Sequence, residues 1–287
     1  MPRPPTRVIV FSHANGFPAG TYRLLFEAWR AAGYTVHAID KYGHDPRYPV
    51  TPNWPHLGAQ LIDFIEQRAL GPAYLVGHSL GGYLSLMAAS RRPDLALGLV
   101  MLDSPVVAGW KARALQFVKA TGIGARFSPG RVSSRRRHLW AGAEEAHAHF
   151  AAKPAFSRWD PRCLADYIAA GTQADGTQRR LSFEREIETA IYDTLPHHLA
   201  RVLRAHPLRC DVGFVRGTES REMRMVGVAG TRRLIAGGRG RIVAIDGSHL
   251  FPFERPDETA ATVLELVAAM RPPGPAERAA SLAAHCL

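Results

Sequence analysis

The stretch AYLVGHSLGGYLSLMAASRRP (73–93) constrains the fold of this 287-residue chain more than any other. A short apolar run ends in the motif GHSLG (77–81), and an alanine- and leucine-rich helical pattern follows at once. Glycines stand two positions before and after Ser79, and without a Cβ they let the chain double back tightly. The pattern therefore predicts a buried strand, a sharp turn with Ser79 at its tip, and a helix.

Short apolar runs alternate with helical patterns over most of the remaining chain. Strands are predicted at 8–13, 35–40, 73–78, 95–103, 210–217 and 241–246, and helices at 21–33, 56–71, 83–93, 222–236 and 256–271. Such alternation is typical of the α/β class, with a mostly parallel central sheet flanked by helices.

The alternation is interrupted once. Residues 104–208 show several amphipathic helical patterns, at 111–122, 144–153, 163–171 and 185–195, but no convincing buried strand. We therefore expect an α/β core formed by residues 1–103 and 209–271, with a helical lid inserted at 104–208. Residues 272–287 are expected to form a loosely attached C-terminal tail.

In its strand–turn–helix setting, GHSLG matches the pattern G-x-S-x-G, which predicts Ser79 as a nucleophile. Over residues 7–271 the chain resembles the α/β-hydrolase fold family. The resemblance implies an oxyanion hole that uses the N–H of the residue after the nucleophile, here Leu80. A second donor is implied in the loop after an early strand, SHANGFP (12–18), and we assign it to Asn15.

The family order of serine, acid and histidine places the base in the loop after the last core strand. His249 lies there, in the sequence DGSHLFPF (246–253). His78 belongs to the turn motif itself, and we expect it to pack beside the serine rather than to take its proton.

The sequence offers several candidates for the acid. Most family members carry an aspartate three residues after a glycine that follows the insertion, but here GTES (217–220) places Ser220 at that position. Asp103, at the end of the strand 95–103, is our preferred acid because some members carry it at that strand end. Glu222 and Glu219 are the alternatives, and a dyad without an acid is the remaining one.

The formal charge of +11 is concentrated in the insertion, where residues 104–162 carry eleven basic and three acidic side chains. This charge could attract an anionic acyl substrate, or it could form a solvated helical face, and we favour the solvated face. No nucleic-acid-binding signature accompanies it, and no histidine cluster has the spacing of a metal site, so neither nucleic acid nor metal is expected.

Three scattered cysteines, no apolar run long enough for a membrane span and no signal-peptide pattern lead us to expect a cytoplasmic protein. The expected function is that of a carboxylesterase-like serine hydrolase that acts on a small acyl substrate without a cofactor. A C–C bond hydrolase or an acyltransferase of the same fold would use the same residues, and a non-catalytic ligand-binding member is the hypothesis from another class. The sequence assigns no oligomeric state.

Overall fold

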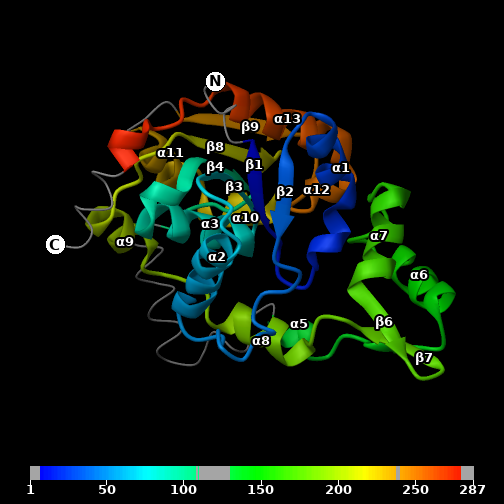
Figure 1. Ribbon diagram of the computed structural model, residues 1–287. Helices are drawn as coiled ribbons and strands as arrows, with labels where there is room; N and C mark the ends of the chain where they lie inside the picture. Colours follow the sequence, from blue (N-terminus) through cyan, green and yellow to red (C-terminus); the bar gives the residue numbers. More distant parts are fainter. Residues whose placement is uncertain (1–6, 108, 110–129, 237–239, 279–287) are drawn as a thin grey trace.

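The computed structural model describes residues 7–107, 109, 130–236 and 240–278 (Figure 1). Its centre is a six-stranded sheet in which every neighbouring pair is parallel, in the order β2-β1-β3-β4-β8-β9. These strands are β1 (Val8–Ser12), β2 (Thr35–Ala38), β3 (Ala73–His78), β4 (Ala96–Leu102), β8 (Val212–Gly217) and β9 (Arg241–Ile245). The α/β class predicted from the alternating pattern is confirmed.

Helices cover both faces of the sheet, because successive side chains of a buried strand point to opposite faces. Phe11 and Val100 pack with α1 (Arg23–Ala31) and α13 (Pro256–Ala269), whereas Val10 and Leu99 pack with α2 (Pro55–Gln67) and α3 (Leu80–Arg91). The remaining core helices are η1 (Ala19–Tyr22), η2 (Pro93–Leu95), α10 (Arg221–Val226), α11 (Ala229–Ala236) and α12 (Phe251–Glu254).

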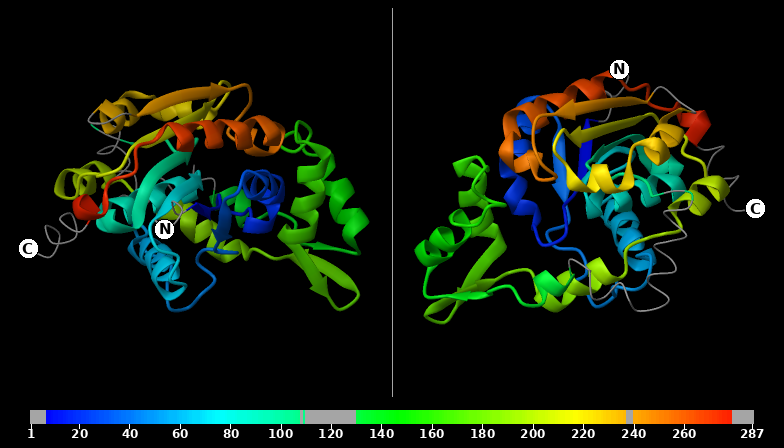
Figure 2. Two further views of the ribbon diagram at one scale, coloured as in Figure 1. Left: turned by 45° about the horizontal axis from the view of Figure 1, so that its top comes forward. Right: turned by 180° about the vertical axis from the view of Figure 1, so that it is seen from behind.

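The described residues between β4 and β8 form what we call the cap segment, which lies outside the sheet and its helices in Figures 1 and 2. Its helices are α5 (Gly130–Ser133), α6 (Ala143–Ala151), α7 (Pro161–Gly171), α8 (Arg185–Asp193) and α9 (Leu199–Ala205). The helix expected at 111–122 and residues 279–287 of the expected tail lie outside the described residues.

The sequence led us to expect a purely helical cap segment, but this expectation was wrong. The segment also contains a small antiparallel sheet of β5 (Leu139–Trp140), β6 (Thr172–Asp175) and β7 (Gln178–Leu181). These strands are short and polar, so they lack the apolar run by which buried strands were recognised. The sequence indicates the hairpin only by Gly176, which begins the two-residue loop between β6 and β7. In the structure this glycine has a φ of 59°.

The helix expected at 222–236 is divided into α10 and α11. Gly227, with φ 80°, follows the last residue of α10, and its N–H donates a hydrogen bond to the carbonyl of Met223. A residue with positive φ cannot continue a right-handed helix, so the chain turns there.

No helix among the described residues is long and apolar enough to cross a membrane.

The turn between β3 and α3 depends on glycines in direct contact with neighbouring backbone. A Cβ added to Gly81 would overlap the carbonyl group of Ser12 in β1, and one added to Gly77 would overlap the carbonyl group of Gly81. Backbone atoms cannot move aside as a flexible side chain can, so these positions exclude any larger residue.

We predict that Gly81→Ala lowers the free energy of unfolding by about 3 kcal/mol, because its methyl group would force β1 and α3 apart. The matched control is Gly142→Ala, whose Cβ meets open space and whose backbone is extended. Urea unfolding of both variants checks this, and equal midpoints would contradict it.

Candidate active site

Ser79 occupies the tip of the turn between β3 and α3 in a strained backbone conformation, with φ 53° and ψ −114°. Such values are rare for residues other than glycine and concentrate at functional sites. The Ser79 N–H donates a hydrogen bond to the carbonyl of Leu102, at the end of the adjacent strand β4. Leu80 is the first residue of α3, so its N–H has no carbonyl partner within the helix.

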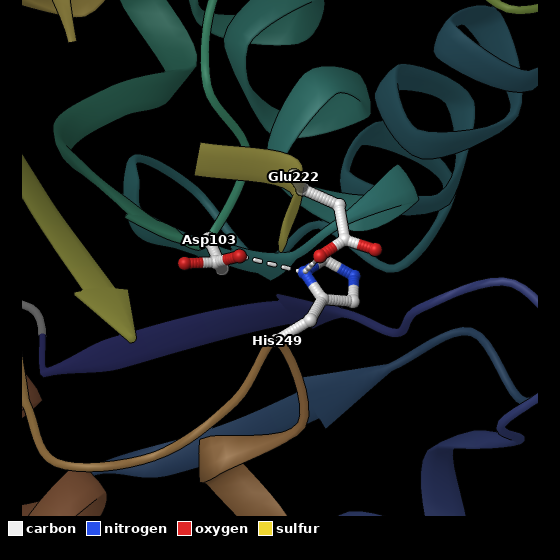
Figure 3. Close-up of side chains that lie close together, drawn as sticks. All are labelled: Asp103, Glu222 and His249. Atoms are coloured by element: carbon white, nitrogen blue, oxygen red, sulfur yellow. Dashed lines mark hydrogen bonds and ion pairs between the residues drawn. The ribbon is translucent and has the colours of Figure 1, made fainter. Parts of the chain in front are cut away.

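Asp103 follows β4 directly and also has a positive φ, 48°. Its side chain is fully buried, and three donors surround its carboxylate, of which His249 is drawn in Figure 3. The backbone N–H of Gly217 donates to Oδ1 at 2.9 Å, while Ser220 Oγ and His249 Nδ1 donate to Oδ2 at 2.5 and 2.7 Å. These bonds hold the carboxylate in one orientation.

His249 lies in the loop between β9 and α12, with its side chain 19% exposed. Because an ionised carboxylate only accepts hydrogen bonds, its bond to Asp103 places the proton on Nδ1 and leaves the lone pair on Nε2. Burial disfavours the charged imidazole, but the hydrogen bond and charge of Asp103, with the charge of Glu222, outweigh it and raise the pKa of His249. The arrangement suits a general base.

The two alternative acids lie at different places. Glu222, in the first turn of α10, has Oε2 at 3.7 Å from His249 Nδ1, which is within ion-pair distance but too long for a hydrogen bond (Figure 3). The Glu219 carboxylate instead pairs with Arg158 of the cap segment at 2.5 Å. Asp103 is therefore the carboxylate that the structure brings into hydrogen-bond contact with His249.

His78 tethers the loop that carries His249. Its Nε2–H donates to the backbone carbonyl of His249 at 2.9 Å, and its Nδ1 accepts from the hydroxyl of Tyr22 at 2.8 Å. Tyr22 in turn accepts from the N–H of Ala14. Burial, with the neighbouring His249, lowers the pKa of His78 well below its usual value, so the ring stays neutral in this chain of bonds.

The loop after β1 is held from inside by His13. Its Nδ1–H donates to the carbonyl of Ala14 at 2.8 Å, and its Nε2 accepts from the N–H of Tyr42 at 3.0 Å. Burial lowers the pKa of His13 to about 4, consistent with a neutral ring that both donates and accepts. These bonds hold the loop that bears Asn15 against the residues that follow β2.

The cap segment reaches this same loop through a buried ion pair that sequence reasoning missed. Arg136 Nη1 lies 2.8 Å from Oε2 of Glu188 in α8, and Arg136 Nη2 donates to the hydroxyl of Tyr167. Asn15 Nδ2 donates to the backbone carbonyl of Glu188 at 2.9 Å, and a Cβ on Gly16 would lie 2.8 Å from Glu188 Oε1. No local sequence signal joins these residues, since 52 positions separate the two charges.

Further basic side chains of the cap segment are engaged on the surface. Arg137, Arg158 and Arg162 pair with Glu145, Glu219 and Asp160 respectively. The other basic residues of the segment include Lys111, Arg113, Lys119 and Arg126, which lie outside the described residues.

Several aromatic side chains of the cap segment form a packed cluster. Phe150, Phe156 and Trp159 lie against one another, and Trp159 stacks on Phe253 of the core at a centroid distance of 4.3 Å. They attach the cap segment to the core.

Ligand atoms of Asp103, Glu222 and His249 lie within 4.8 Å of one another, a spacing that a metal ion also uses. A metal would have to displace the hydrogen bond from Nδ1 to Asp103 Oδ2. The buried carboxylate with its three donors fits acid–base chemistry instead.

The profile of the "Alpha/beta hydrolase family" matches residues 9–262. The chain belongs to the alpha/beta hydrolase family.

Curated relatives match over part of their length. The chain is 31% identical over 103 residues to a pyrethroid hydrolase of Sphingobium wenxiniae, covering 35% of this chain and 36% of that protein. It is 28% identical over 115 residues to a monoglyceride lipase of Rattus norvegicus, covering 36% and 37%. The match thus spans a little over a third of each relative.

Solved structures match over most of the chain. The crystal structure of E-2-(acetamidomethylene)succinate hydrolase has a TM-score of 0.69 at 22% identity, covering 91% of both chains. A thioesterase domain from the curacin biosynthetic pathway has a TM-score of 0.65 at 19% identity, covering 91% and 92%. These structures share the fold.

We predict that Arg136→Met lowers the free energy of unfolding by about 3 kcal/mol at neutral pH, because Glu188 is left buried without its partner. Burial raises the pKa of Glu188, and losing Arg136 would raise it further. The folded state then binds a proton more tightly than the unfolded chain, so the deficit shrinks as the pH falls.

Urea unfolding at several pH values measures this effect. The control is the double variant Arg136→Met/Glu188→Leu, which removes both charges and should recover most of the stability. A deficit that is independent of pH would contradict the assignment.

Proposed function

We propose that this protein is a serine hydrolase that cleaves carboxylic esters or related acyl substrates through an acyl-enzyme on Ser79. The observation that carries the proposal is the hydrogen bond from His249 Nδ1 to the buried Asp103, whose neighbour Leu102 accepts the N–H of Ser79 in its strained turn. It leaves Nε2 of His249 with a lone pair in a loop that His78, the neighbour of Ser79, holds in place.

In this mechanism His249 Nε2 takes the proton of Ser79 Oγ as the oxygen attacks the substrate carbonyl. Asp103 orients the ring and stabilises the imidazolium that forms. The N–H groups of Leu80 and Asn15 stabilise the negative oxygen of the tetrahedral intermediate. His249 then returns the proton to the leaving group and activates the water that hydrolyses the acyl-enzyme.

Acyl transfer to another acceptor and hydrolysis of a C–C bond would use the same residues. A non-catalytic binding protein would leave Ser79 unactivated. The names of the two curated relatives, a pyrethroid hydrolase and a monoglyceride lipase, support ester hydrolysis over these alternatives.

The test is hydrolysis of p-nitrophenyl esters of increasing acyl length, together with a monoglyceride. We expect Ser79→Ala to lower kcat/KM by about 10⁴-fold or more, and Asp103→Asn by about 10³- to 10⁴-fold. The wild type should also be labelled at Ser79 by an active-site-directed phosphonate. Absence of both turnover and labelling would refute the hydrolase, whereas labelling without turnover would leave the nucleophile assigned and the substrate to be found.

The proposal also predicts a pH dependence. His249 must be neutral to act as the base, and Asp103 raises its pKa above that of free histidine. We therefore expect kcat/KM to fall as the pH drops through a pKa above about 6.5. In Asp103→Asn this acidic limb should move to lower pH, because the imidazolium loses its partner. An acidic limb that is the same in both proteins would count against Asp103 as the acid.

A further inference from the structure

Ser220 stands three residues after Gly217, where many members of the family have the acid, yet it contacts the acid supplied by another strand. It is fully buried, and its Oγ accepts the N–H of Met223 at the start of α10. Ser220 Oγ donates its single hydroxyl proton to Asp103 Oδ2, at an oxygen–oxygen distance of 2.5 Å. Glu222 Oε2 lies 3.3 Å from Ser220 Oγ. The serine is therefore hydrogen-bonded to Asp103 and lies beside Glu222.

Glu222 brings a second negative charge to the same edge of the imidazole ring. Its Oε2 lies 3.7 Å from His249 Nδ1, whereas Asp103 Oδ2 is bonded to that atom (Figure 3). Its side chain is 42% exposed, whereas that of Asp103 is fully buried. An imidazolium at this position is therefore stabilised by two carboxylates.

The other ionisable groups around His249 do not replace this charge. His78 is neutral, and the buried phenols of Tyr83 and Tyr192, near Glu222, have pKa values raised above their usual range by burial. Two described arginines of the neighbouring elements have partners other than Glu222. Arg158 pairs with Glu219 and approaches Glu254, and Arg224 donates to the backbone carbonyl of Glu219.

We propose that His249 is supported by two carboxylates: Asp103 orients the ring, Glu222 adds charge as a positioning residue, and the Ser220 hydroxyl fixes Asp103 beside Glu222. This inference rests on the proposed function for its consequence in catalysis, but its effect on His249 can be measured without a substrate. Part of the electrostatic support of the base then comes from α10, which follows the strand β8.

The matched pair of variants is Glu222→Gln and Glu219→Gln. Both remove one charge from the same loop and helix, but only Glu222 faces His249. In the Ser79→Ala background, NMR titration of the His249 ring, assigned with His249→Gln, should show a lower pKa in Glu222→Gln and an unchanged one in Glu219→Gln. A His249 pKa that is unchanged in Glu222→Gln, or equally lowered in both variants, would overturn the proposal.

With an active ester, the acidic limb of kcat/KM should move to lower pH in Glu222→Gln only. In the Asp103→Asn background, Glu222 is the carboxylate nearest to His249. Glu222→Gln should therefore lower the remaining kcat/KM by roughly a further tenfold. If Glu222→Gln lowered kcat/KM by the same factor with Asp103 and with Asn at position 103, the proposal that both carboxylates support His249 would be contradicted. If no ester is hydrolysed, the proposed function fails, and the NMR titration still decides the role of Glu222.

Ser220→Ala tests the hydrogen bond that holds Asp103 in place. It should lower kcat by roughly 10- to 100-fold with little change in KM, since a hydrogen bond to a charged group is lost. Ser220→Thr, which keeps a hydroxyl, should recover activity. A loss in Ser220→Ala that is explained entirely by a lower fraction of folded protein, measured by circular dichroism, would argue against this part of the proposal.

Discussion

The buried carboxylate of Asp103 is the interaction on which the site depends. It lies at the end of a central strand, and its three donors come from β8, from the start of α10 and from the loop after β9. An ionised group without such partners would be costly at this depth. The hydrogen bonds to Asp103 therefore join the loops that follow β4, β8 and β9 at one edge of the sheet, and they give His249 a fixed orientation.

Much of this arrangement could be predicted from the sequence, because its signals are local. The motif around Ser79 combines glycine spacing with a strand and a helix, and the order of elements places His249 after the last strand. Asp103 was favoured only by its position at a strand end. Which of Asp103, Glu222 and Glu219 bonds to His249 depends on where the side chains point, and the pattern of apolar residues in the sequence does not determine this. The hydrogen bond from Ser220 to Asp103 could not be predicted either, because the sequence shows only that Ser220 stands where many members of the family have an aspartate.

The cap segment was the less predictable part. Its small sheet is made of short polar strands, and its contacts with the core join residues that are far apart in the chain. Lys41 donates to the carbonyl of Ser182, and Trp54 donates through its indole N–H to Thr194. Together with Asn15 and Glu188, these bonds attach α8 and the residues beside it to loops that follow β1 and β2.

The contact between Gly16 and Glu188 has a consequence for how members of this family can diverge or be recombined. A cap is often regarded as an interchangeable module that can be replaced to obtain a different pocket. Here the loop next to the nucleophile is shaped against a carboxylate of the cap, which is neutralised by an arginine of the cap. A chimera that kept this cap but carried a residue with a side chain at position 16 would place that side chain against Glu188, so the loop and α8 would have to be exchanged together.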